Sequence, residues 1–288
     1  MTFPAMIEVR YRNRLGNNLF QYALGRILAE EKGYALSAAP ITGFPNTRHP
    51  VHGTAYEQPR CLFRKVQIID FAGLLADPTP QRLILDGWFQ RGEYYWPYRD
   101  RILKWFGKDP AIQMPDFQPD LIVHVRRDDY LYYGWALPFS YYEEAIERLN
   151  PPGGRICILT DDPTDPFFRL FERWQPQFYH GDMLQEFWLM AQAPRLVLSQ
   201  STFSWWAAFL AESQVTVCPA PSFGCWRPRP DKMEVNLVDR ERFICIDCPE
   251  PYQLTPDDLL RARYVRRFKH RLSQAWSRAF SFLRQSNA

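Results

Sequence analysis

The sequence contains no long hydrophobic run. No window in its 288 residues approaches the apolar length needed to span a bilayer. The N-terminal stretch MTFPAMIEVRYRNRLG has neither an apolar core nor a small-residue cleavage site, so no signal peptide is expected. We therefore expect a cytoplasmic protein, with peripheral contact at the cytoplasmic membrane face left open by the basic C-terminal segment described below.

Cysteine is sparse, and its pattern excludes two classes of small domain. The six cysteines, in a chain without a secretory signal, are expected to be free thiols and not a disulfide framework. Cys245 and Cys248 form the only CxxC pair. Because neither a second CxxC nor a nearby histidine pair accompanies it, no zinc site is expected.

Acidic residues are missing from the end of the chain. From Arg261 onward there are eight basic residues and no acid, and residues 255–288 carry a charge of +6. The net charge of the whole chain is +3, which leaves −3 for the body. A body of this charge has no basic surface for nucleic acid, so we expect no nucleic-acid partner.

The chain does have enough apolar residues for two hydrophobic cores. Hydrophobic residues make up 46% of it and aromatic residues 16%, and its length exceeds the usual size of a single core. Short apolar runs alternate with helical periodicity in the second half, which predicts βαβ units and a parallel sheet. The expected strands are 121–125, 155–159, 195–198 and 215–218, and the expected helices are 140–149, 167–174, 185–193 and 205–212.

A proline-spaced segment at 109–119 is the best candidate for a linker. We accordingly expect an N-terminal domain at residues 1–116, a C-terminal domain at 117–250, and a basic amphipathic helix at 251–288. In that last segment, Thr255 and the proline after it form a strong helix start. Its apolar stripe suits either an anionic membrane surface or packing on the body of the protein.

The N-terminal half begins with a strand at 6–11, a turn containing Gly16 and Asn17, and a helix that ends at Gly33. A helix start of this kind presents backbone N–H groups to an anion. The turn is neither a GxGxxG nor a Walker loop, so a plain helix start is the alternative. Further elements are expected as a strand at 66–71, a strand and turn at 83–90, and an aromatic helix at 94–106.

Charged side chains follow the strand at 121–125, at the edge of the sheet where open α/β folds bind ligands. Arginine offers a planar fork of donors that suits a phosphate or a leaving diphosphate. Because side chains alternate along an extended chain, we expect His124 and Arg126 to face the ligand while Asp128 or Asp129 holds the intervening arginine. The alternative is an ordinary surface cluster of arginine and aspartate.

Two further strands also end in polar residues. Asp161 and Asp162 could accept hydrogen bonds from a purine edge or from ribose hydroxyls, or one of them could simply cap the next helix. Ser201, Thr202 and Ser204 supply hydroxyls and helix N-terminal amides that suit a diphosphate, in addition to capping their helix. A shared crevice explains three such strand ends more simply than coincidence does.

Five stretches of the chain resemble the α-1,2-fucosyltransferases of bacteria and animals. They are RNRLGNNLFQYA, LDGWFQRGEYY, HVRRDDY, LTDD and SQSTFSWWAA, in the family's order. The stretch EFWLM at 186–190 also fits the family's pattern before the last of them. The chain departs from the usual motifs at four positions, where Asp128, Asn18, Gln200 and Asn13 replace Gly, Gln, Asn and Gly. No arginine, serine or LTDD carboxylate of the motifs is lost, so the departures bear on the pocket and on the choice of acceptor.

The resemblance implies an α/β protein with a two-domain GT-B-like glycosyltransferase fold and Rossmann-like parallel sheets. It also implies that the C-terminal domain binds GDP-fucose and that L-fucose passes, with inversion and without a metal or other cofactor, to the 2-hydroxyl of a terminal galactose of a glycan. The chemistry of the residues agrees, because arginine and helix amides can neutralise a departing diphosphate.

Site roles follow from the motifs and the resemblance together. The expected catalytic residues are Arg126, Arg127 and Asp129. The expected donor-binding residues are Gly16, Asn17, His124, Arg126, Asp161, Asp162, Ser201, Thr202, Phe203 and Ser204, and the expected acceptor-binding residues are Trp88 and Glu93.

Several alternatives stay open at this point. The general base could be Asp129, Glu93 or Asp86, and Asp129 could instead be the structural partner of Arg127. The enzyme could use another regiochemistry or another GDP-sugar, or the chain could be a non-catalytic nucleotide-sugar-binding scaffold at a membrane. The loops at 38–60 and 220–232 are expected to build the acceptor groove.

Overall fold

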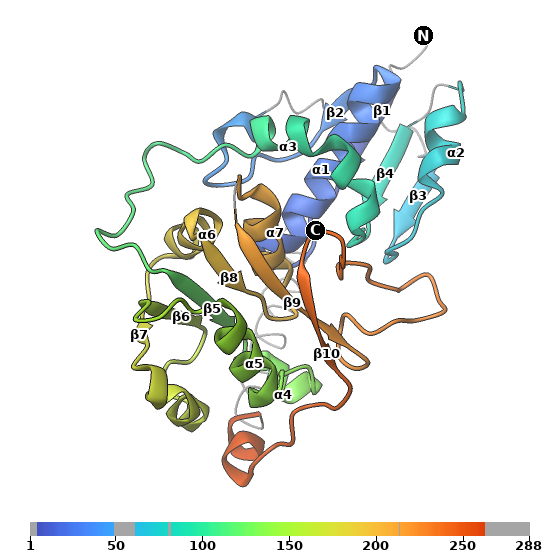
Figure 1. The fold of residues 1–288 in the computed structure, drawn as a ribbon. Helices are drawn as coiled ribbons and strands as arrows, with labels where there is room; N and C mark the ends of the chain where they lie inside the picture. Colours follow the sequence, from blue (N-terminus) through green and yellow to red (C-terminus); the bar gives the residue numbers. More distant parts are fainter. Residues whose placement is uncertain (1–4, 49–60, 80–81, 213, 263–288) are drawn as a thin grey trace, which may run out of the picture.

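The computed structural model describes residues 5–48, 61–79, 82–212 and 214–262, which form two α/β units (Figure 1). The first unit holds a four-stranded parallel sheet of order β2-β1-β4-β3. Its elements are β1 (Met6–Val9), α1 (Leu15–Lys32), β2 (Ala35–Ser37), β3 (Cys61–Arg64), α2 (Phe71–Ala76), β4 (Arg82–Asp86) and α3 (Arg99–Trp105).

The second unit holds a six-stranded parallel sheet of order β10-β9-β8-β5-β6-β7. The α/β class with two parallel sheets is therefore confirmed. The strands are β5 (Leu121–Val125), β6 (Ile156–Thr160), β7 (Gln177–Phe178), β8 (Arg195–Val197), β9 (Val215–Pro221) and β10 (Ile244–Cys248). The helices are α4 (Asp128–Tyr133), α5 (Phe139–Leu149), α6 (Met183–Gln192) and α7 (Thr202–Leu210), with a 3₁₀ helix, η4, at Pro166–Trp174.

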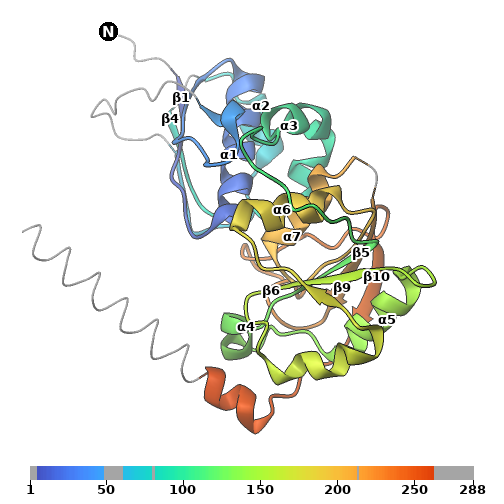
Figure 2. The same ribbon diagram turned by 90° about the vertical axis from the view of Figure 1, so that its left-hand side faces the viewer.

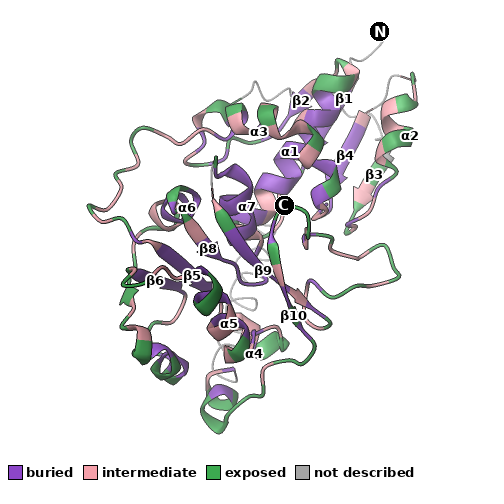
Figure 3. Ribbon diagram, in the orientation of Figure 1, coloured by how far each residue is buried: buried purple, intermediate pink, exposed green. Residues whose placement is uncertain are grey.

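The order of the second sheet reverses beside its central strand. After β5 the chain adds β6 and β7 on one side, then returns to place β8 on the other side of β5. All five residues of β5 are buried, as expected for a strand covered on both faces (Figure 3). The gap between the carboxyl ends of β5 and β8 is thus a topological switch point, the place where open α/β sheets bind ligands.

Helices α6 and α7 lie between the two units (Figure 2). Phe20 of α1 packs on Trp205 and Trp206 of α7, with ring centroids 5.0 and 4.8 Å apart. All three side chains are fully buried, and one continuous hydrophobic core joins residues of both sheets. These three aromatic side chains therefore fix α1 against α7.

Two expectations about the first unit are wrong. The strand expected at 66–71 lies earlier, at Cys61–Arg64, and Gln67 instead donates its backbone N–H to the Lys232 carbonyl oxygen at 3.1 Å. The long aromatic helix expected at 94–106 is broken into 3₁₀ turns at Gly92–Tyr94 and Trp96–Tyr98, followed by α3. The proline at the start of the second turn explains the break, since it has no N–H to continue a helix.

The C-terminal helix begins where the sequence predicts. Residues 256–262 are helical, and the Thr255 hydroxyl accepts a hydrogen bond from the Asp258 backbone N–H at 3.2 Å, as an N-cap does. The remainder of the predicted basic helix, from residue 263, lies outside the described residues. Within the described ranges, no helix combines the length and apolar character that crossing a membrane requires.

Candidate functional site

A cavity of about 570 Å³ lies at the switch point of the second sheet. Its walls come from the ends of β5 and β6 and from the N-termini of α1 and α7, so it joins residues of both units. Many of the residues singled out in the sequence meet there. They are Gly16, Asn17, His124, Arg126, Asp129, Asp161, Ser201, Thr202 and Phe203.

Arg126 is held at the wall of this cavity by two carboxylates. Its guanidinium contacts Asp129 Oδ1 at 2.9 Å and Asp161 Oδ2 at 3.2 Å. Burial raises the pKa of Asp161, and Arg126 opposes that rise. The arginine is only partly buried, with 18% of its side chain exposed, so it is oriented and still accessible to a ligand.

His124 lies two residues earlier on the same side of the strand, as expected. Its Nδ1 is 2.9 Å from the Ser199 hydroxyl of the neighbouring strand end. Burial, and to a lesser extent the charge of Arg126, lowers the pKa of His124 to about 3. The imidazole is therefore neutral at physiological pH and acts at the cavity as a hydrogen-bonding group without charge.

The N-termini of α1 and α7 meet at the cavity because the residue at the contact is a glycine. A Cβ added at Gly16 would lie 2.5 Å from Thr202 Oγ1 and 2.7 Å from the Phe203 backbone nitrogen. Two helix N-termini therefore present their amides and positive dipole ends to one space, which suits a diphosphate. Ser201 caps α7 by accepting a hydrogen bond from the Phe203 N–H at 3.2 Å.

Ser204 differs from the expectation for a donor-binding side chain. It is fully buried, and its hydroxyl donates to the Ser201 carbonyl oxygen at 3.3 Å, inside the first turn of α7. Ser204 follows the N-cap Ser201 by one helical turn, and its side chain lies on the face of α7 that packs against the core. It supports the helix start without lining the cavity.

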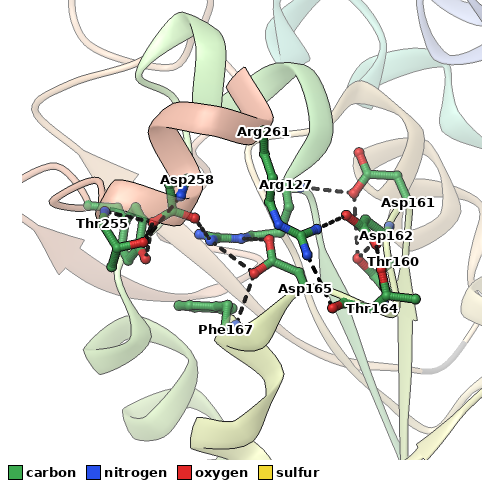
Figure 4. A network of polar contacts seen from close by, with 11 residues as sticks. Arg127, Thr160, Asp161, Asp162, Thr164, Asp165, Phe167, Thr255, Asp258 and Arg261 are labelled. Carbon is green, nitrogen blue, oxygen red and sulfur yellow. Dashed lines mark hydrogen bonds and ion pairs between the residues drawn. The ribbon is translucent and has the colours of Figure 1, made fainter. Parts of the chain in front are cut away.

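Arg127 has partners that the sequence did not suggest (Figure 4). Its Nε lies 2.9 Å from Asp165 Oδ2 and its Nη2 lies 2.6 Å from Asp258 Oδ1, while Phe167 and Tyr252 cover the guanidinium at 4.1 and 4.6 Å. The expected pairing with Asp128 or Asp129 is wrong, because those residues open α4.

Only 1% of the Arg127 side chain is exposed, so the expectation that it acts directly in catalysis does not fit its position. Its backbone N–H donates to Asp161 Oδ1 at 2.9 Å, and Asp161 in turn contacts Arg126. Arg127 is thus a positioning residue that links the strand end, the 3₁₀ helix that contains Phe167 and the C-terminal segment.

Three other expected residues lie away from the first cavity. Asp162 faces Arg261 and accepts a hydrogen bond from the Thr164 hydroxyl at 2.7 Å. Glu93 accepts a hydrogen bond from Asn236 Nδ2 at 2.8 Å and lines neither this cavity nor the one beside it. Asp86 is held by the Arg12 guanidinium, with one contact at 2.8 Å, and lines neither cavity.

A second cavity of about 380 Å³ adjoins the first. Trp88, expected at an acceptor site, lies in its wall, as do Arg227 and Arg229 from the predicted groove loop at 220–232. Residues 38–48, the described part of the other predicted loop, line neither cavity. The residues common to both cavities are Asn13, Asn17, Tyr130, Trp135 and Thr202.

The sequence reasoning missed several wall residues. Tyr130 and Glu186 both stand inside stretches that carried the family resemblance, HVRRDDY and EFWLM, and that was the signal available for them. Gln90 stands inside LDGWFQRGEYY and had the same signal, whereas Trp135 and His180 had none. Burial raises the pKa of Glu186, whose carboxyl accepts a hydrogen bond from the Gly181 N–H at 3.3 Å.

Carboxylates that could hold a cation also gather at the first cavity. Among the described residues, Asp128, Asp129 and Asp161 each offer an oxygen within 4.8 Å of the others. Arg126 contacts two of these three residues, so positive charge is already supplied there by the protein.

Several known proteins that resemble the chain are glycosyltransferases. The family model described as Glycosyl transferase family 11 matches residues 168–222, which include the start of α7. The O-antigen biosynthesis glycosyltransferase WbnK of Escherichia coli is 28% identical over 117 residues, covering 35% of this chain and 38% of that protein. The alpha-1,2-colitosyltransferase of Escherichia coli is 20% identical over 301 residues, covering 86% and 98%.

Among solved structures, the fucosyltransferase NodZ from Bradyrhizobium aligns with a TM-score of 0.48 at 15% identity, over 73% of this chain and 94% of that one. The sequence matches make this chain similar to glycosyltransferases. Its similarity is to glycosyl transferase family 11, which confirms the family resemblance expected from the motifs.

Proposed function

We propose that the chain is an inverting glycosyltransferase that moves L-fucose from GDP-fucose to the 2-hydroxyl of a terminal galactose of a glycan. The observation that carries this proposal is the meeting of Arg126 with the N-termini of α1 and α7 at one cavity. A guanidinium and two sets of helix-end amides can stabilise the charge that develops on a leaving diphosphate.

The donor is held, in this proposal, with its diphosphate between Arg126 and the two helix starts. Neutral His124 offers a hydrogen bond without adding charge. Asp161 serves mainly to orient Arg126 and the backbone of Arg127. Glu186 lines the same cavity, and its carboxyl is available to accept hydrogen bonds from ribose hydroxyls or a purine edge.

The chemistry requires one bond to form and one to break at the anomeric carbon of the sugar. The acceptor hydroxyl attacks from the side opposite the diphosphate, whose oxygen leaves with the electron pair of the broken C–O bond. The hydroxyl proton passes to a carboxylate, for which Asp129 is the candidate among the three expected bases that lies at the cavity. Neutralisation of the diphosphate by Arg126 and helix amides makes a metal unnecessary for this step.

The linkage in the proposal is supported by the relative named alpha-1,2-colitosyltransferase, which aligns over 86% of this chain. The same name favours a second candidate, transfer of colitose with the same 1,2 linkage. Fucose transfer with another regiochemistry is the remaining enzymatic alternative.

The test is incubation with GDP-fucose and a panel of galactosides, followed by linkage analysis of any product. Arg126→Ala should abolish transfer while the fold stays intact, and Arg126→Lys should restore little because lysine lacks the planar fork. The matched control is Arg155→Ala, which removes an exposed arginine at the opposite end of the same sheet. Near-normal turnover in Arg126→Ala would contradict the proposed role of Arg126 at the diphosphate. Donor binding without turnover in the wild type would favour a non-catalytic scaffold.

A further inference from the structure

The second cavity differs from the first in its charged groups. No carboxylate stands among its sixteen lining residues, which belong to the described part of the chain, whereas two guanidiniums do. Sites for neutral sugars need hydrogen-bond acceptors for the hydroxyl groups as well as flat rings to stack on the sugar faces. Here Trp88 and Trp135 supply rings and side-chain amides supply neutral acceptors, while the charged side chains supply donors only, which suits a sugar that also carries a negative group.

One of the two guanidiniums has no partner at close range. Arg229 contacts Asp231 Oδ2 at 2.6 Å, so its charge is already compensated. Arg227 makes no hydrogen bond or ion pair with any described residue, and its charge acts on Asp231 only through longer-range attraction. A cation without a close partner, at the wall of a cavity that no carboxylate lines, favours a negative group on the ligand.

The loop that carries Arg227 is fixed at its base. The Trp226 backbone N–H donates to Gln200 Oε1 at 3.2 Å, and Gly224, at φ +73°, comes so close that an added Cβ would lie 2.4 Å from the same oxygen. Gln200 is 1% exposed and stands where the family's motif has the shorter asparagine. Its extra methylene lets the carboxamide reach the loop, so the loop that carries Arg227 is held by a residue that departs from the family's motif.

The two cavities are continuous, since Asn17, Tyr130 and Thr202 are among the residues that line both. A sugar in the second cavity therefore extends toward the donor site. We propose that the acceptor is an acidic glycan in which the sugar next to the fucosylated galactose carries a carboxylate, and that Arg227 recognises this group. This inference rests on the proposed function, because it assigns the second cavity to the acceptor of that reaction.

The experiment compares two acceptors that differ in one group, a galactosyl-glucuronic acid disaccharide and the corresponding galactosyl-glucose. With GDP-fucose, kcat/KM should be about fivefold higher for the acidic disaccharide, as one partly exposed charge pair allows. Arg227→Gln should remove most of this preference. Arg240→Gln, which removes an arginine that lines neither cavity, should keep it.

Equal kcat/KM values in the wild type, or a preference that survives in Arg227→Gln, would overturn the inference. Failure of the proposed function has a different signature, namely that neither disaccharide receives fucose from any variant. In that case calorimetry in the presence of GDP still tests whether Arg227 recognises the carboxylate, because it compares the binding of the two disaccharides. Tighter binding of the acidic disaccharide that is lost in Arg227→Gln supports the inference, and equal binding refutes it.

Discussion

The contact between α1 and α7 at Gly16 gives the most direct test of how the first cavity is assembled. In Gly16→Ala, the new methyl group would lie 2.5 Å from Thr202 Oγ1 and 2.7 Å from the backbone nitrogen of Phe203. Carbon atoms normally approach their neighbours no closer than about 3.5 Å, so the new methyl group would be too close to these atoms by roughly 1 Å. Because backbone atoms are among those met, side-chain rotation alone cannot relieve the contact and the helix starts must separate.

The size of the effect follows from that separation. Overpacking of this kind costs about 1–3 kcal/mol, and the better helix propensity of alanine offsets up to about 1 kcal/mol of it. We expect the free energy of unfolding to fall by about 1–2 kcal/mol. The effect on activity should be larger, because a displacement of about 1 Å in groups that position a reacting substrate can lower the rate about 100-fold.

The assay combines urea denaturation with steady-state kinetics in which the donor is varied. Gly107→Ala is the matched control, since the added Cβ would meet its nearest atom, on Asn46, at an ordinary 3.6 Å. The control should leave both stability and donor kinetics near those of the wild type. Wild-type stability and donor kinetics in Gly16→Ala would refute the view that this close contact holds the two helix starts at the cavity.

Three further outcomes are expected. The pKa of His124 falls from 6.5 to about 3 on folding, so the unfolded chain binds more protons than the folded chain between these values. The free energy of unfolding should therefore fall as the pH drops below 6.5, by up to about 1.4 kcal/mol per pH unit. Denaturation measured across pH should show a shallower slope in His124→Gln. Asp258→Asn, which leaves Arg127 short of a carboxylate, should cost about 3–5 kcal/mol in urea denaturation, whereas exposed Asp257→Asn should cost little; equal losses would contradict the pairing. EDTA should change transfer by no more than about twofold, and loss of activity restored by magnesium or manganese would show that a metal is needed.

The strand ends were predictable because each is a local pattern. A buried apolar run that stops at charged or hydroxyl residues indicates both the strand and its carboxyl end. The parallel sheet then brings these ends together, so that His124, Arg126, Asp161 and Thr202 line one cavity. The orientation of Arg126 relative to Arg127 also followed from alternation along the strand.

The partners of Arg127 could not be predicted in the same way. Asp165 and Asp258 lie 38 and 131 residues away along the chain, and nothing in the local sequence marks them as more suitable than adjacent Asp128. The second cavity was predicted only in part: Trp88 and the loop at 220–232, which contains Trp226, were expected at an acceptor site, but not their meeting beside Tyr130 in one cavity. Its position depends on how the two units pack, which single-segment patterns do not encode.

The ion pair between Arg127 and Asp258 also has a consequence for synthesis of the chain. A ribosome adding about 5–20 residues per second needs about 7–26 seconds to travel the 131 residues that separate them. Once Asp165 has been made, the Arg127 guanidinium has that carboxylate as a partner but still lacks Asp258. A nascent chain that stalls before Asp258 therefore carries a guanidinium whose second carboxylate is missing.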